Sequence, residues 1–207
     1  MSNNHKSRSN GNKRRSNRES KDFSQSKPVK VSDMALRLVP LGGLEEFGKN
    51  MWAIEQGDDI ILADMGLQMP GADQPGVDFI VPNATYLREK ASQIRGLFLT
   101  NGHYSSIGAV PYILHLFPGI DIFATEATFA TLESRRSFYS QNMKYRKHIV
   151  DEGSSIRLGS IKVDVFKLNF NFAGNIGLCF YTLQGKVIYA PSFKFDYDQA
   201  NEKMVDL

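Results

Sequence analysis

The sequence predicts an α/β sandwich, in which sheets and helices are stacked in layers. Strand patterns open the folded part, two buried strands alternate with helical patterns in its middle, and strands alone follow from Ile156. This order of strands, then β-α-β-α, then strands is typical of a layered α/β sandwich. A polar leader, residues 1–34, precedes the sandwich region, residues 35–207.

The first predicted elements are strands. The segment "ALRLVPL" (35–41) alternates in polarity and runs into Gly42-Gly43, which predicts a strand and a turn. The segments "MWAIEQ" (51–56) and "IILAD" (60–64) flank a Gly-Asp-Asp turn, so they predict a hairpin whose second arm is buried on both faces. Prolines and glycines then mark a long loop over residues 70–82.

Two helices and two strands are predicted next. Residues 84–94 have apolar side chains near helical spacing, and "GLFL" (96–99) indicates a buried strand. Residues 107–117 predict a helix, and Pro111 confines its start to the preceding turn. A strand over 121–125, a helix over 126–138 and strands within 156–168, 177–183 and 186–190 complete the pattern.

The leader differs sharply in composition from the rest. Residues 1–34 contain nine Lys/Arg, three Asp/Glu and one aromatic residue, a net charge of +6. Because the whole chain carries +3, residues 35–207 carry a net −3. The small apolar area of these residues cannot offset the conformational entropy that they would lose on folding. We therefore predict that they form a disordered tail. It resembles the basic arms that bind nucleic-acid backbones, and a solubilising leader without a partner is the alternative. An RNA contact would centre on Lys13, Arg14, Arg15 and Arg18.

Other features of the sequence concern the cellular location of the protein. No apolar run approaches the roughly 20 residues that a membrane span requires, and the leader lacks the apolar segment of a secretory signal. Cys179 is the only cysteine, so no internal disulfide can form, and we predict a cytoplasmic protein. The Cys179 thiol is expected to be a small buried apolar group rather than a nucleophile.

One loop concentrates polar side chains. The segment "TNGHYSS" (100–106) follows a buried strand, which is where α/β folds usually carry their chemistry. It contains His103 between Asn101 and the pair Ser105-Ser106. A serine-hydrolase interpretation is weak because no Gly-x-Ser-x-Gly elbow is present. The two serines are also expected to cap a helix that begins near Ile107.

Three segments together resemble ribonuclease J. They are "LRLVPLGGLEEFGKNM" (36–51), "DMGLQMPGADQPGVDFIVPNATYL" (64–87) and "IRGLFLTNGHYSSIGAVPYIL" (94–114). The resemblance implies a metallo-β-lactamase-type αββα sandwich that would carry a two-zinc site for RNA cleavage. It also implies that residues 35–207 supply only the N-terminal half of that sandwich. Leu207 would then fall near the start of the family's β-CASP insertion. The chain is expected to be a fragment of a longer protein, and the alternatives are that it needs a partner or has adapted to stand alone.

The chain departs from the family at its metal ligands. Ribonuclease J carries His-x-His-x-Asp-His where this chain has Asn101, His103, Ser105 and Ser106. The family's Asn-His-Ser, with a metal-binding histidine, matches Asn169-Phe170-Asn171. Its Thr-Gly-Asp, whose aspartate bridges the metals, matches Ala190-Pro191-Ser192, followed by an intact Phe-Lys-Phe-Asp. Asp64 is retained, at a place that supports the site in the family.

These departures predict a vestigial metal pocket that binds no metal. Zinc takes His, Cys or carboxylate ligands at about 2.0–2.3 Å, and of the matched positions only His103 still offers one. His5, His115 and His148 cannot replace the set at their spacings. The predicted pocket contains Asp64, Asn101, His103, Ser105, Ser106, Phe170, Asn171 and Ser192.

Three functions follow from this reading. The first is a catalytically inactive ribonuclease J-like subunit that regulates or scaffolds an active paralogue in homo- or hetero-oligomers. The second is a metal-dependent 5′–3′ exonuclease or endonuclease with a rearranged site. The third is an RNA-binding module whose neutral polar pocket holds a phosphate or a ribose. We expect no catalytic residue and no cofactor, RNA as the partner, and no membrane.

Overall fold

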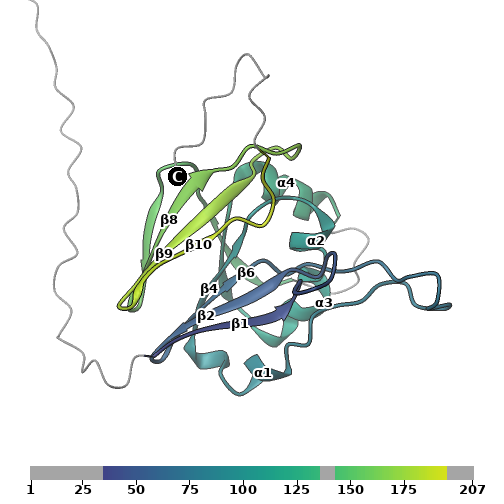
Figure 1. Ribbon diagram of the computed structural model, residues 1–207, viewed down its shortest axis with the longest axis horizontal. Coiled ribbons are helices and arrows are strands. Elements are labelled where there is room, and N and C mark those ends of the chain that lie inside the picture. Colours follow the sequence, from purple (N-terminus) through teal and green to yellow (C-terminus); the bar gives the residue numbers. More distant parts are fainter. Residues whose placement is uncertain (1–34, 136–142, 195–207) are drawn as a thin grey trace, which may run out of the picture. The chain divides into compact units, whose positions relative to one another are not determined.

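The computed structural model describes residues 35–135 and 143–194 (Figure 1). The predicted tail and its basic residues Lys13, Arg14, Arg15 and Arg18 lie outside them, as do Phe195 and Asp196. In these residues no helix is long and apolar enough to cross a membrane. The strands are β1 (Leu36–Gly42), β2 (Met51–Gln56), β3 (Asp59–Ala63), β4 (Ile94–Leu99), β5 (Ile120–Ala124), β6 (Tyr145–Ile149), β7 (Ser155–Leu158), β8 (Ile161–Lys167), β9 (Ile176–Thr182) and β10 (Gly185–Tyr189). The helices are α1 (Thr85–Arg88), η2 (Ala91–Gln93), α2 (Tyr104–Ile107), α3 (Val110–Ile113), η3 (Leu114–Leu116) and α4 (Glu126–Ser134).

The first sheet has six strands in the order β1-β2-β3-β4-β5-β6. Strands β1, β2 and β3 pair antiparallel, and β3 to β6 pair parallel. The predicted hairpin is present, with Gln56 opposite Asp59, and β3 is almost wholly buried. Strand β6 was not predicted, because it lies at the sheet edge and its middle residues are charged and exposed rather than apolar.

The second sheet has four antiparallel strands in the order β10-β9-β8-β7. It contains the three C-terminal segments that the alternating pattern predicted as strands. Side chains of β8 alternate between buried and half-buried positions, as expected of a strand with one face on the core. Cys179 lies in β9 and is half-buried, so the expectation that it is a buried residue was wrong. Its neighbours Leu178 and Phe180 occupy the core-facing positions.

Two apolar cores hold the layers together. Phe98 and Phe123 of the first sheet pack against Val163 and Phe180 of the second, so the sheets lie face to face. The other face of the first sheet packs against the helices, with Leu99 and Phe129 in that second core. Figure 1 shows this arrangement of one helical layer and two sheets. The α/β sandwich predicted from the sequence is therefore confirmed.

The helices are shorter than the sequence pattern predicts. The predicted helix over 107–117 is divided into α2, α3 and η3. Pro111 lies in the first turn of α3, and it lacks the backbone N–H that would donate to the carbonyl of the residue four positions earlier. The Ser105 carbonyl accepts a hydrogen bond from the Asn50 N–H at 3.0 Å, and the Ala109 N–H donates to the carbonyl of Met65, in a crossing segment, at 2.9 Å. In a continuous helix the Ser105 carbonyl and the Ala109 N–H would bond to each other, so these tertiary contacts separate α2 from α3.

That crossing depends on a glycine. A Cβ atom at Gly66 would overlap the carbonyl oxygen of Ser105 and lie 2.9 Å from the backbone nitrogen of Asn50. Both neighbours are backbone atoms that are held by hydrogen bonds, so neither can move away cheaply. Gly66 thus lets residues 65–67 pass against the loop that carries His103.

We expect Gly66→Ala to lower the free energy of unfolding by about 2–3 kcal/mol or more, because the overlap must be relieved by moving two segments. Chemical denaturation of the purified variant measures this loss. Gly71→Ala is the matched control, since the added Cβ there would meet only the flexible side chain of Asp73. Equal stability of the two variants would contradict the role given to Gly66.

Candidate functional site

The site begins at the carboxyl ends of β3 and β4. Asp64 directly follows β3, has a φ of 59° and is fully buried. Its Oδ1 accepts from the Thr100 backbone N–H at 2.8 Å, and the Thr100 hydroxyl lies 2.9 Å from both carboxyl oxygens. Its Oδ2 accepts from the Tyr189 hydroxyl of β10 at 2.9 Å. The carboxyl group therefore joins the two sheets.

Burial governs the ionisation of this group. Loss of solvent raises the pKa of Asp64 to about 7, although hydrogen bonds from Thr100 and Tyr189 favour the charged form. Burial also raises the pKa of Tyr189 well above its ordinary value, and the nearby carboxylate adds to this. The Tyr189 hydroxyl therefore stays protonated and can donate to Asp64 at neutral pH.

The side-chain oxygen and nitrogen of Asn101 both form hydrogen bonds within its own loop. Its side-chain Oδ1 accepts from the backbone N–H of His103 at 2.9 Å, and its Nδ2 donates to the Thr100 hydroxyl at 3.2 Å. The residue is fully buried. At this position the resemblance to ribonuclease J implies a histidine ligand, whereas the amide of Asn101 shapes the turn.

His103 caps a helix. Its Nδ1 lies 2.8 Å from the Ser105 hydroxyl and 3.4 Å from the Ser105 backbone nitrogen, and it is the N-cap of α2. Because the backbone N–H can only donate, Nδ1 is the acceptor and the neutral ring carries its proton on Nε2. The expectation that Ser105 and Ser106 cap a helix beginning near Ile107 was wrong. The helix starts at Tyr104, and both serines lie within it.

Aromatic rings enclose the same histidine. The ring of Phe172 stacks on His103 with centroids 4.7 Å apart, and the ring of Tyr104 lies 4.2 Å away at a tilt. Phe170 contacts Phe172 at 5.2 Å, one ring further from His103. Burial, followed by the charge of Arg135, lowers the pKa of His103, so the ring is neutral at neutral pH.

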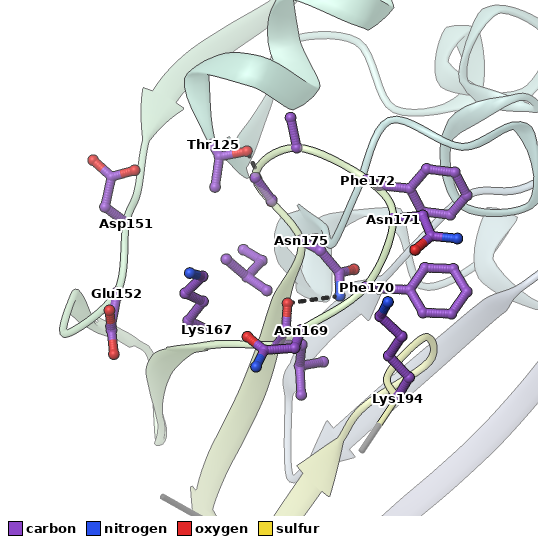
Figure 2. Close-up of a pocket in the computed structure, with 14 residues that line it drawn as sticks. Thr125, Asp151, Glu152, Lys167, Asn169, Phe170, Asn171, Phe172, Asn175 and Lys194 are labelled. Carbon is purple, nitrogen blue, oxygen red and sulfur yellow. Dashed lines mark hydrogen bonds between the residues drawn. The ribbon is translucent and has the colours of Figure 1, made fainter. Parts of the chain in front are cut away.

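The β8–β9 loop brings the remaining predicted residues to this edge. Asn175 Nδ2 donates to the backbone carbonyls of Leu168 and Ser192, at 3.2 and 2.7 Å. Phe170 and Asn171 project from the loop on the side of Phe172 (Figure 2). Ile176 N–H donates to the Thr100 carbonyl at 3.0 Å. The structure therefore gathers the segments that carry the eight predicted site residues at one edge of the sheets.

The donor set does not fit a two-zinc site. Among residues 35–135 and 143–194, no three His, Cys, Asp or Glu side chains lie together so that they could hold a metal ion. His103 has one nitrogen engaged by Ser105, and the carboxyl group of Asp64 is engaged by Thr100 and Tyr189. Zinc requires three or four good ligands, which these side chains do not supply.

Curated proteins from two staphylococcal species are similar in sequence to this chain. The chain is 32% identical over 168 residues to a protein named Ribonuclease J 2 from Staphylococcus saprophyticus, covering 81% of this chain and 30% of the relative. It is 30% identical, with the same coverage, to Ribonuclease J 2 from Staphylococcus aureus. The chain is a member of the ribonuclease J-like family. It spans about 30% of the length of these curated relatives, and no family model matches it.

Solved structures support the fold of this ribonuclease J-like chain. A protein of unknown function from Enterococcus faecalis has a TM-score of 0.58 at 15% identity, covering 77% of this chain and 44% of its own. The metallo-β-lactamase fold protein YhfI from Bacillus subtilis has a TM-score of 0.52 at 11% identity, covering 75% and 62%. The chain therefore has the metallo-β-lactamase fold and covers only part of these proteins.

Sequence reasoning missed several residues of this site. Thr100 and Tyr189 hold Asp64, and Phe172 stacks on His103. Thr100 directly follows β4, which was a signal that its hydroxyl lies near the other strand ends. Nothing in the sequence indicates the contact of Tyr189, because it joins positions 125 residues apart across two sheets.

The pKa of Asp64 gives a testable pH dependence. Its folded value of about 7 exceeds the ordinary value of 3.8, so between these the folded chain holds a proton that the unfolded chain releases. The stability from this proton is present below about pH 4 and is lost as pH rises towards 7. As pH rises from 4.5 to 6.5, we expect the free energy of unfolding of the wild type to decrease relative to that of Asp64→Asn. The expected decrease is up to about 1.4 kcal/mol per pH unit.

Denaturant unfolding of both proteins across that range measures the difference. The Asn variant retains the shape of the side chain without the titrating proton. Parallel stability curves for the two proteins would show that Asp64 does not titrate with a raised pKa.

Proposed function

We propose that this chain is a catalytically inactive ribonuclease J-like protein that acts in RNA processing or decay as an RNA-binding, scaffolding or regulatory subunit. One observation carries the proposal. Of the six positions that match the family's metal ligands, only His103 has a side chain suited to zinc, and its Nδ1 is engaged by Ser105. Without bound metal, no water is activated and no Lewis acid acts on the phosphate.

The pattern of substitutions supports a settled metal-free state. Both positions that carry a metal-binding carboxylate in the family are serines here, Ser105 and Ser192. Loss of the metals alone would leave unpaired anions in a partly buried pocket, which is costly. Serine removes that cost, and at Ser105 the hydroxyl now holds the cap of α2.

RNA is the expected partner. The names of the relatives support a role with RNA, and the basic tail supplies charge for a phosphate backbone. An active ribonuclease J paralogue is a second expected partner, in a homo- or hetero-oligomer. We place this function in the cytoplasm.

Metal content tests the first part of the proposal. We expect protein purified without chelators to contain well under one zinc or manganese per chain by mass spectrometry, with none retained after zinc is added and the protein dialysed, because three good ligands are lacking. A two-zinc metallo-β-lactamase fold protein prepared identically is the positive control. One or two tightly bound metals per chain would overturn the proposal and make ribonuclease activity the working assumption.

RNA affinity tests the second part. We expect the full chain to bind a short single-stranded RNA with a strong salt dependence, because the tail carries nine Lys/Arg. Removal of residues 1–34 is expected to weaken binding and to reduce the slope of log K against log salt. A charge variant of the full chain, with Lys13, Arg14, Arg15 and Arg18 replaced by Gln, separates charge from length. An unchanged affinity and slope in both variants would exclude the tail as an RNA contact.

A further inference from the structure

A row of positive charge crosses the outer face of the second sheet. In the strand register, Arg157 of β7 pairs with Lys162 of β8, and Lys162 pairs with Tyr181 of β9. Tyr181 pairs in turn with Lys186 of β10. The ammonium groups of Lys162 and Lys186 lie over the Tyr181 ring, 4.5 and 5.1 Å from its centroid. We call Arg157, Lys162 and Lys186 the cation row.

Only part of this charge is balanced. Asp164 lies on the same face and forms an ion pair with Lys162 at 3.0 Å. Hydrogen bonding to Asp164 raises the pKa of Tyr181 to about 12, so the phenol is neutral. Within the residues that the structure describes, neither Arg157 nor Lys186 forms an ion pair with a carboxylate. Three cations against one carboxylate leave this face positive.

The same face becomes apolar towards the end where β10 stops. Cys179 lies opposite Ile188, and Ile188 is 56% exposed. Further along, the Phe166 ring covers Gly177, where an added Cβ would meet it. The helices pack on the first sheet, and no described helix covers the outer face of the second (Figure 1). An occupant of this face therefore needs carboxylates beside apolar side chains.

The chain continues from this end of the sheet. The Lys194 backbone N–H donates to the carbonyl of Asn169, just beyond the end of β8, at 2.9 Å. The next residues, "FDYDQANEKMVDL" (195–207), lie outside the described residues and carry four acids and one lysine, a net charge of −3. They include the apolar side chains Phe195, Tyr197, Met204, Val205 and Leu207. Their composition therefore complements the face in charge and in apolar character.

Residues 195–207 are also long enough to cross the face. Neighbouring strands lie about 4.8 Å apart, so four strands span about 15 Å, and the four positions from Phe166 to Lys162 span about 13 Å along β8. The diagonal of this area is about 20 Å. Thirteen residues span about 20 Å even at the helical rise of about 1.5 Å per residue, and about 45 Å when extended.

We propose that residues 195–207 dock on the outer face of the second sheet. Their carboxylates pair with the cation row, and their apolar side chains cover Cys179, Ile188 and Phe166. Exposed ion pairs are individually weak and are screened by salt, so salt weakens the docking. The interaction goes beyond the function proposed above, because neither RNA nor a paralogue takes part in it.

Cys179 is the only cysteine of the chain and lies on the covered face, so its reaction with a maleimide measures how often the docked segment leaves. The test compares the full chain with a chain that ends at Lys194, in native buffer of low salt and constant pH. We expect the full chain to react at least about fivefold more slowly. Salt at about 0.5 M should speed the reaction of the full chain and leave the shortened chain unchanged.

A full-length variant removes the charge and keeps the segment. It replaces the four acids by amides, as Asp196→Asn, Asp198→Asn, Glu202→Gln and Asp206→Asn, and should react at nearly the rate of the shortened chain. The matched control, Asp73→Asn with Asp78→Asn in the exposed loop between β3 and α1, should react like the wild type. Thermal melting checks that each protein is folded, and the amide variant decides the question if the shortened chain does not fold.

Lys186→Glu tests the other side of the contact. Because Lys186 lies near Cys179, its replacement also alters the reactivity of the thiol itself. This local effect is the same in the full and the shortened chain, so the ratio of their rates isolates the docking. We expect Lys186→Glu to lower that ratio from at least about fivefold towards one.

Two outcomes would overturn the proposal. One is an equal reaction rate of the full chain, the shortened chain and the amide variant at low salt. The other is a slow reaction of the full chain that becomes faster on dilution, since a second copy of the chain would then cover the face. A faster reaction in the amide variant and at high salt, with the control unchanged, supports the docking. RNA binding is measured separately, so neither result alters the test of the proposed function.

Discussion

The burial of the Asp64 carboxyl group between the two sheets is the constraint on which the rest of the site depends. A buried carboxyl group is costly unless it is hydrogen-bonded, so Thr100 and Tyr189 must both reach it. The end of β3, the end of β4 and the end of β10 are thereby brought to one point. The loop that carries His103 starts directly after Thr100, so its position follows from the same contact.

The residues around His103 form a packed cluster of polar and aromatic side chains. Asn101 shapes the turn, His103 caps α2, and Phe172 stacks on the histidine ring. Asn101 and His103 stand at positions where the resemblance to ribonuclease J implies metal ligands. In this structure the loop keeps its conformation by hydrogen bonding and stacking.

The β8–β9 loop has two sides with different properties. One side presents Phe172 to His103 and is part of the packed cluster. The other side borders a cavity where the Oδ1 atoms of Asn169 and Asn175 remain unpaired in the described residues. The same loop therefore borders both the packed cluster around His103 and the cavity next to it.

The sequence by itself determined the fold class, the hairpin of β2 and β3, the second sheet and the residue types at the positions matched to the family's ligands. These features depend on local alternation, on buried apolar runs and on residue type, all of which can be read along the chain. Only the tertiary structure decided the rest. It divided the helix predicted over 107–117, made His103 the cap in place of the serines, and brought Tyr189 to Asp64 and Phe172 to His103. The His103 cap is a local contact with Ser105. The other outcomes depend on contacts between segments far apart in the chain, and these outweigh local preference wherever a backbone carbonyl or a buried carboxyl group needs a partner.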